Sequence, residues 1–480
     1  MKYKAAPGVF DILPKDPKEK WRCTHIWQYV ESVFREVAKS YGFQEIRTPA
    51  FERTELFARG VGETTDIVSK EMYTFEDRGG RMMSLRPEGT APVMRAYIEH
   101  QLQNQAPVHK LFYIEPMFRY ERQQAGRYRQ HHQVGFEAIG NSSPEQDAEV
   151  IDLCYTIYQK LGLKDLQVMI STLGDTESRL AFKNALVDYL KTYEEDLSED
   201  SKVRLKVNPL RILDSKDPKD QEILRGAPSI HDFLTEESQI HFKTVCVILD
   251  SLGIRYEVNK QIVRGLDYYN QTVFEVTASQ LGAQNSIGGG GRYDGLIKEL
   301  GGPDVPATGF ATGIERIIQT MLGQGVKIPD AYRPVIFLIP LGSEAKATCI
   351  HLLKELRTEG VPSEMDYSGR KLGKVMHYAN QIRAQYVAVI GEEEIKNKKI
   401  QLKEMETGDI SEVSFEELSH LLYFEQQASE YMNAIERLQH PFETIQQAEF
   451  FMKKLIHSIE YTKQTTGKLQ EAIEKMKEIL

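Results

Sequence analysis

An arginine-rich segment at residues 118–133 is the first place in this sequence where the residue types could do chemistry. It carries Arg119, Arg122, Arg127 and Arg129 against one glutamate, although the whole chain has a net charge of -10. Arg119 lies among apolar neighbours, where an unpaired guanidinium is costly, so we expect a fixed anion as its partner. Guanidinium groups suit phosphate oxygens because they donate hydrogen bonds in pairs. The alternative is a solvated hairpin tip.

The strand-like residues that follow have one polar face and one apolar face. Because side chains alternate along a strand, Gln133, Gly135 and Glu137 share a face, and the residues between them form the core side. An amide, a bare backbone and a carboxylate suit a small molecule that is cationic or donates hydrogen bonds. The pattern predicts one wall of a small-molecule pocket.

Two further segments carry groups that could line the same pocket. Glu88 adds a carboxylate two residues before the hydroxyl of Thr90. Arg264 supplies a cation, and Tyr268 and Tyr269, which follow it in the same segment, supply two phenols. These groups predict a site that recognises its ligand by hydrogen bonds and charge.

Glycines mark two other candidate positions. The four glycines at residues 288–291 let backbone approach a ligand closely, and Tyr293 follows them. The strand before them and the helical run after them favour a structured turn over a flexible linker. Residues 309–316 predict a strand of small residues that enters a helix with Arg316 in its first turn. Helix N-terminal amides and a guanidinium both favour phosphate, whereas tight helix packing alone would not require the arginine.

Several common chemistries are excluded by missing motifs. The sequence has no GxxxxGK[ST] run, no HExxH and no GxGxxG between a strand and a helix, so a P-loop ATPase, a zincin and a Rossmann dehydrogenase are poor interpretations. His131 and His132 are adjacent in a predicted strand and point to opposite faces, so they cannot share one metal ion. No metal site is predicted.

The elements that must position these residues form three parts. A helix near residues 21–41 precedes a long antiparallel hairpin of residues 109–120 and 129–140. A helical module follows from about residue 175 and separates two halves of a sheet, which returns at residues 271–277. After a linker at residues 328–334, strands alternate with amphipathic helices, which predicts a small α/β domain with a largely parallel sheet.

Length and composition limit the number of domains, the cellular compartment and the kinds of partner that the protein can have. The 480 residues suggest about three domains. No apolar run approaches the roughly 18 residues of a membrane span, and the N-terminus has no signal-peptide core. The four cysteines are far apart in sequence, which is typical of a reducing cytosol rather than a disulfide scaffold. We therefore expect a cytoplasmic protein without a membrane partner.

Taken together, the ordered motifs resemble a class II aminoacyl-tRNA synthetase. Residues 41–49 (Tyr-Gly-Phe-Gln-Glu-Ile-Arg-Thr-Pro) look like motif 1, residues 118–137 like motif 2 and residues 309–316 like motif 3. Residues 264–269 (Arg-Gly-Leu-Asp-Tyr-Tyr) and 290–295 (Gly-Gly-Arg-Tyr-Asp-Gly) resemble the two signatures of the histidyl-tRNA synthetase family. The resemblance runs from about residue 7 to residue 411.

This resemblance implies an α+β fold with defined parts. The expected catalytic domain spans residues 1–330 on an antiparallel sheet, with a helical insertion domain at 172–255. An α/β anticodon-binding domain would span 334–424, and a helical C-terminal extension 425–480. The resemblance also implies a homodimer that uses histidine, ATP and histidine tRNA, with Mg²⁺ beside the ATP.

The resemblance further implies a role for each candidate residue. Arg119 would contact the α-phosphate, Arg127 the ATP phosphates and Arg316 the γ-phosphate, while Arg264 would lie between the histidine carboxylate and the α-phosphate. The histidine pocket comprises the remaining candidates. Its implied members are Glu88, Thr90 and Gln133 at the amino-acid head, Glu137 and Tyr269 at the ring nitrogens, and Tyr268 and Tyr293 around the ring.

Three departures from the family pattern affect the details. Gln123 replaces a usual proline in the motif 2 loop, although Gln124 still matches the residue expected near the extra 5′ guanosine of histidine tRNA. His131 replaces a usual phenylalanine. Many relatives carry cysteines in the insertion near Ser198, Ser201 and Ser215, and their absence here argues against a structural metal.

Two alternatives compete with a tRNA-charging enzyme. One is a non-catalytic paralogue of the kind that regulates ATP phosphoribosyltransferase, but such proteins lack the anticodon domain and lose signature residues. The other is a class II synthetase for another amino acid, which would leave the tyrosines and Glu137 unexplained.

Within the C-terminal domain, residues 366–371 lie where a loop at a strand end would meet RNA.

Overall fold

The computed structural model describes residues 3–62, 65, 67–121, 127–260, 262, 266, 268–278, 286–423 and 426. The chain divides into two compact units, residues 1–331 and residues 332–480, each of which is described by itself. Among the described residues, no helix has both the length and the apolar character needed to cross a membrane.

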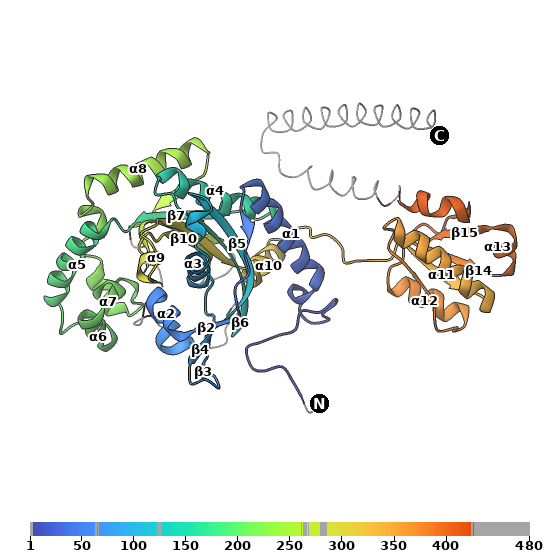
Figure 1. Ribbon diagram of the computed structural model, residues 1–480, viewed down its shortest axis with the longest axis horizontal. Coiled ribbons are helices and arrows are strands. Elements are labelled where there is room, and N and C mark those ends of the chain that lie inside the picture. Colours follow the sequence, from blue (N-terminus) through green and yellow to red (C-terminus); the bar gives the residue numbers. More distant parts are fainter. Residues whose placement is uncertain are drawn as a thin grey trace. The chain divides into compact units, whose positions relative to one another are not determined.

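An eight-stranded sheet forms the centre of the first unit (Figure 1). The strands, in spatial order, are β1 (Gln44–Glu45), β5 (His109–Phe118), β6 (Gln130–Ile139), β11 (Ala307–Gly313), β10 (Ser286–Arg292), β9 (Asn270–Ala278), β7 (Leu166–Thr172) and β8 (Tyr256–Val258). All neighbours are antiparallel except β1 with β5 and β7 with β8 at the two edges. The antiparallel catalytic sheet is therefore confirmed.

The two faces of the sheet carry different cores. On one face Val134 and Phe136 of β6 pack with α1 (Thr24–Ser40), α4 (Pro144–Lys160) and α10 (Ile314–Gly323). The strand alternation had predicted this core side. The other face packs against α3 (Thr90–Glu99) and the short α9 (Leu296–Glu299), and this second core contains the candidate tyrosines. The candidate pocket thus lies on the α3 face.

The four glycines at residues 288–291 lie inside strand β10, so the expectation of a structured turn was wrong. A Cβ atom at Gly290 would overlap the carbonyl oxygen of Gly309 on β11, and one at Gly291 would overlap that of Thr272. Glycine is required because the neighbouring strands β9 and β11 approach this backbone too closely for a side chain.

A small sheet and helix precede the pocket in the chain. Strands β2 (Phe51–Arg53), β4 (Met82–Leu85) and β3 (Thr74–Glu76) form an antiparallel sheet in that spatial order, and α2 (Thr54–Val61) packs beside α3. The β3–β4 hairpin projects from the body in Figure 1.

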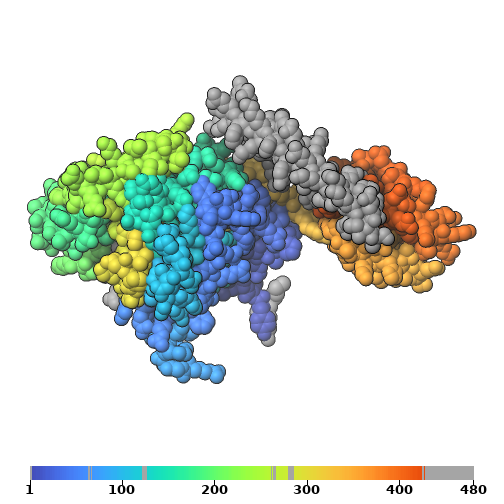
Figure 2. Space-filling view, turned by 45° about the horizontal axis from the view of Figure 1, so that its top comes forward, coloured from blue at the N-terminus to red at the C-terminus, as the bar shows by residue number. Residues whose placement is uncertain are grey.

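A helical module separates β7 from β8 in the chain. It comprises α5 (Thr176–Lys191), α6 (Glu199–Val207), α7 (Pro218–Leu224) and α8 (Glu236–Ser251). Within it, the buried Asp220 accepts hydrogen bonds of 2.7, 2.6 and 2.5 Å from the hydroxyls of Ser198, Ser201 and Ser215. Figure 2 shows the module, in green, side by side with the yellow segment that contains α9.

The second unit is an α/β domain with a five-stranded sheet. The strands, in spatial order, are β13 (Ser363–Met365), β12 (Ile336–Pro340), β14 (Tyr386–Ile390), β15 (Lys399–Glu404) and β16 (Ile410–Ser414), with helices α11 (Ser343–Thr358), α12 (Leu372–Gln381) and α13 (Glu392–Asn397). The first three strands are parallel as predicted, but β15 and β16 are antiparallel. Strands β15 and β16 were not predicted from the sequence, because their polar, alternating residues lack the continuous apolar run that indicates a buried strand. Apart from Gln426, the predicted extension at 425–480 lies outside the described residues.

Candidate active site

Glu137 on β6 is the centre of a buried polar pocket. The hydroxyl of Thr90 donates to Oε1 of Glu137 at 2.9 Å, and the hydroxyl of Tyr293 donates to Oε2. The Glu137 side chain is 1% exposed. Burial raises the pKa of Glu137 to about 8, although the hydrogen bonds from Tyr293 and Thr90 oppose this rise. The pocket therefore holds a carboxyl that changes its charge near neutral pH.

A second buried carboxyl, Glu88, lies at the start of α3. It accepts hydrogen bonds from the backbone N–H groups of Thr90 at 2.7 Å and Ala91 at 2.9 Å. Burial raises the pKa of Glu88, whereas these N–H groups and the nearby charge of Arg119 act against the rise. Two carboxyl groups thus lie within one enclosed site, which suits a ligand that brings positive charge or several N–H donors.

Three tyrosines enclose this site from the side of β9 and β10. The ring centroids of Tyr268 and Tyr269 are 4.7 Å apart, and the Tyr293 ring lies 5.4 Å from Tyr268 and 6.1 Å from Tyr269. All three side chains are buried, and burial raises the pKa of both Tyr268 and Tyr293 well above the ordinary value. The phenols of Tyr268 and Tyr293 therefore stay neutral and can donate hydrogen bonds at physiological pH.

Tyr113 on β5 belongs to the same pocket, and sequence reasoning missed it. A Cβ atom at either Gly89 or Gly135 would overlap the Tyr113 ring, so the ring occupies the space that both glycines leave open. The prediction that Gly135 offers bare backbone to a ligand was therefore wrong. The register of the β5–β6 hairpin could have identified Tyr113, because Tyr113 is paired directly with Gly135 across the hairpin.

Three of the predicted arginines form a positive cluster beside the pocket. Arg119 Nε donates to the Pro87 carbonyl at 2.8 Å, Arg316 Nη1 donates to the Ser286 carbonyl at 2.7 Å, and Arg127 pairs with a glutamate. Burial lowers the pKa of Arg316, and the charges of Arg127 and Arg119 lower it further, whereas those of Glu121 and Glu275 oppose this change. Like charges held this close favour an anion between them.

The two histidines of motif 2 have different surroundings. Burial and the charge of Arg119 lower the pKa of His131 to about 3, so its imidazole is neutral beside the arginines. His132 instead donates its backbone N–H to Glu315 at 2.8 Å and places Nδ1 3.0 Å from the same carboxyl. Glu315, another residue that sequence reasoning missed, thereby ties β6 to the first turn of α10 next to Arg316.

The remaining candidates divide into described and undescribed positions. Oε1 of Gln133 is buried and has no hydrogen-bond partner among the described residues. A ligand amino group could supply the missing donor. Arg264 and Gln124, together with Gln123, lie outside the described residues. In the described part of the chain, no group of three or more histidine, cysteine, aspartate or glutamate side chains could hold a metal ion.

The arrangement combines two chemistries in one site. A tyrosine-lined, carboxyl-containing cavity suits a small ligand with several N–H donors, and the adjacent arginine cluster suits phosphate oxygens. A reaction that joins such a ligand to a nucleotide would develop charge where the two regions meet.

Two family models match the chain. Residues 8–317 match the model described as histidyl-tRNA synthetase, and residues 336–423 match the model described as an anticodon binding domain.

Individual relatives extend over nearly the same residues. The chain is 60% identical over 422 residues to the histidine–tRNA ligase of Protochlamydia amoebophila, and this match covers 88% of this chain and 100% of that protein. It is 45% identical over 425 residues to the histidine–tRNA ligase of Bacillus subtilis, covering 88% and 99%. The solved structure of apo histidyl-tRNA synthetase from S. aureus matches with a TM-score of 0.75 and 38% identity, covering 88% of this chain and 100% of that chain.

Proposed function

The chain belongs to the histidyl-tRNA synthetase family, and from this premise we propose how its residues join histidine to tRNA. The protein is an aminoacyl-tRNA synthetase: it activates histidine with ATP to histidyl-adenylate and pyrophosphate, then transfers the histidyl group to the 3′ end of histidine tRNA. One observation carries the residue-level proposal. It is the enclosure of Glu137, bonded to Thr90 and Tyr293, beside a cluster of three arginines.

The alternative of a regulatory paralogue is not favoured. The relatives with 60% and 47% identity over 88% of the chain are histidine–tRNA ligases, and residues 336–423 match an anticodon binding domain. A regulatory paralogue of the kind considered above would lack that domain.

We assign ATP to the arginine cluster. Arg119 would hold the α-phosphate, where negative charge grows as the histidine carboxylate attacks, and Arg127 and Arg316 would hold the outer phosphates. Fixed guanidinium groups stabilise such a transition state without reorganisation. Arg264 is assigned to the reacting centre from its motif alone, because it lies outside the described residues.

We assign histidine to the tyrosine-lined cavity. Glu88, Thr90 and the unpartnered Oε1 of Gln133 would bind the amino group. Glu137 would accept from one ring nitrogen of the imidazole and Tyr269 would contact the other, with Tyr268 and Tyr293 around the ring. A pocket built for these hydrogen bonds rejects a side chain that lacks them, because buried partners would be left unpaired.

Other assignments complete the proposal. Mg²⁺ keeps few protein ligands when it binds ATP phosphates. The carboxyls whose charges reach Arg316 are Glu275 and Glu121, and Glu121 also pairs with Arg127 at 3.3 Å. When bound, Mg²⁺ would neutralise phosphate charge. We also propose a homodimer, a cytoplasmic location with the rest of translation, and Gln124 as a contact to the tRNA acceptor end.

Histidine should drive ATP–pyrophosphate exchange at least about 10³-fold faster than any other amino acid when all twenty are compared. The expected reason is that only the imidazole satisfies the acceptors and phenols of the cavity. Radiolabelled pyrophosphate incorporation into ATP measures this directly. Exchange with several amino acids at similar rates would contradict the assignment of the pocket.

A loop of the second unit is a candidate contact for tRNA. Asp366, at the end of β13, accepts hydrogen bonds from the Ser368 hydroxyl at 2.6 Å and the Gly369 N–H at 3.0 Å, which hold the loop in place. Tyr367 is 66% exposed, and the guanidinium of Arg370 lies 5.3 Å from the Tyr378 ring centroid. The exposed Tyr367 ring suits stacking on an unpaired base, and Arg370, three residues further along the same loop, adds a cation.

The double substitution Tyr367→Ala, Arg370→Ala should lower kcat/KM for tRNA charging by about 10- to 100-fold, because base stacking alone contributes about 1–3 kcal/mol. ATP–pyrophosphate exchange should be unchanged, since the adenylate forms in the other unit. Tyr332→Ala removes a similarly exposed tyrosine, 68% exposed, outside the loop and serves as the control. Equal losses in both proteins would show that the loop has no special role.

A further inference from the structure

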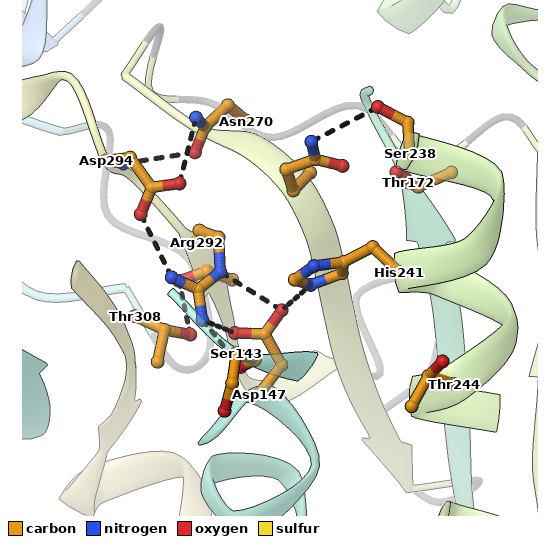
Figure 3. Close-up of polar contacts among 12 residues, drawn as sticks. Ser143, Asp147, Thr172, Ser238, His241, Thr244, Asn270, Arg292, Asp294 and Thr308 are labelled. Carbon is orange, nitrogen blue, oxygen red and sulfur yellow. Dashed lines mark hydrogen bonds and ion pairs between the residues drawn. The ribbon is translucent and has the colours of Figure 1, made fainter. Parts of the chain in front are cut away.

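A fully buried arginine, Arg292, ends strand β10 directly before the pocket residue Tyr293 (Figure 3). Its guanidinium has five N–H groups, and the structure provides five contacts for them. Nε and Nη2 donate to Asp147 at 3.2 and 2.7 Å, Nη2 also donates to the Ser143 carbonyl at 3.1 Å, and Nη1 donates to the Asn141 carbonyl and to Asp294, each at 3.0 Å.

The network continues from Arg292 into the helical module. Asp147, in the first turn of α4, also receives Nε2 of His241 on α8 at 2.8 Å (Figure 3). Burial would raise the pKa of Asp147, but the hydrogen bond from His241 and the charge of Arg292 hold it below its ordinary value. Asp147 is therefore a charged centre shared by one residue of the sheet and one residue of the module.

The same network links the two segments that carry the pocket tyrosines. Asn270 follows Tyr269, and its side chain accepts from the backbone N–H of Asp294 at 3.1 Å and lies within 3.4 Å of the Asp294 carboxyl (Figure 3). Asp294 in turn follows Tyr293. The spacing between Tyr269 and Tyr293 is thus fixed by the residues that follow them in the chain, which are not pocket residues.

The helical module makes a second, separate contact with this segment. Arg179 on α5 donates from Nη1 to the backbone carbonyl of Tyr269 at 2.8 Å. The next residue but one, Gln271, has a φ of 47° and donates from its side chain to Ser238 on α8 at 3.2 Å. A left-handed glutamine is strained, so the surrounding contacts must hold the chain in this conformation.

We propose that Arg179, His241, Asp147 and Arg292 are positioning residues through which the helical module sets the geometry of the histidine pocket. None of the four is among the residues assigned to histidine. Tyr268 and Tyr269 lie just before β9, and Tyr293 lies just after β10. The backbone N–H of Tyr293 donates to the Ala307 carbonyl at 2.8 Å, and the network adds the contacts that join both segments to the module. This inference rests on the assignment of histidine to that pocket.

Two substitutions on separate helices test the proposal in the full-length protein. Arg179→Met keeps most of the apolar stem but removes the donor to Tyr269, and His241→Phe keeps a ring but removes the donor to Asp147. Each should raise the KM for histidine in pyrophosphate exchange by about 10-fold or more and leave the KM for ATP unchanged, because small displacements of binding groups are costly. His241→Gln, which can donate from its amide, should recover most of the affinity.

A pH profile separates positioning from a general loss of stability. The hydrogen bond from Tyr293 holds the pKa of Glu137 down, so a loosened Tyr293 should move the pH dependence of kcat/KM for histidine to higher pH. Leu249→Ala is the matched control, because it opens a cavity on the buried face of α8 without touching the network. It should lower the melting temperature and leave the histidine KM and the pH profile unchanged.

The outcomes distinguish this inference from the proposed function. If the parent protein shows no histidine-specific exchange, the pocket assignment itself fails. If the parent shows it while Arg179→Met and His241→Phe keep the parental histidine KM, or if Leu249→Ala raises that KM equally, the network serves stability alone and the inference is overturned.

Discussion

Glu137→Gln should reduce kcat/KM for histidine in ATP–pyrophosphate exchange by about 10³-fold, with little change in the KM for ATP. The carboxyl accepts from Thr90 and Tyr293 and is assigned to one ring nitrogen of histidine. Glutamine keeps the shape but can never carry the negative charge that strengthens a hydrogen bond from the imidazole. Steady-state exchange kinetics at pH 8 measure the loss.

The same substitution should stabilise the fold, which makes it distinguishable from simple damage. The pKa of Glu137 is about 8 in the folded protein and 4.5 in an unperturbed chain. Between these values the folded state retains a proton that the unfolded state has lost, so stability falls as pH rises through this window. Glutamine removes that penalty. We expect a melting temperature at least about 3 °C above the parent at pH 8, with a smaller difference at pH 5.

Two results would contradict this account of Glu137. Retention of histidine-dependent exchange in Glu137→Gln would remove the carboxyl from recognition. A melting temperature that differs equally at both pH values would show that Glu137 does not titrate in this range.

Arg119→Ala should slow formation of histidyl-adenylate by about 10²- to 10³-fold in a single turnover, the effect of removing one fixed group that stabilises developing charge. Its Nε donates to the Pro87 carbonyl at 2.8 Å, which holds the guanidinium in place. Because the charge that it faces grows only in the transition state, the histidine KM should change far less than the rate. Rapid-quench measurement of adenylate tests this.

Two further variants make the Arg119 result specific. Arg119→Lys retains a positive charge but loses the paired donors, so it should recover only part of the rate. Arg81→Ala removes an exposed arginine in the β3–β4 turn, which pairs with Asp77, and should leave the rate unchanged. An unaltered single-turnover rate in Arg119→Ala would exclude Arg119 from the chemical step.

Predictions from local patterns succeeded where the pattern has a local physical cause. Strand alternation placed Val134 and Phe136 in the core and Glu137 on the other face, because successive side chains of a strand point to opposite faces. The small-residue strand followed by a helix was predicted at residues 309–316, and β11 and α10 occupy these positions. Prediction failed where a neighbouring strand determines the outcome, as for the glycines of β10.

The sequence alone determined the family, the antiparallel sheet of the first unit and the set of charged and phenolic residues available for catalysis. Only the tertiary structure revealed that Tyr113 fills the space left by Gly89 and Gly135, and that Arg292 is joined to His241 through Asp147. The physical reason is how far apart in the chain the interacting residues are. Strand and helix periodicity act between residues a few positions apart, whereas these contacts depend on the register of paired strands and on helices that are distant in the chain.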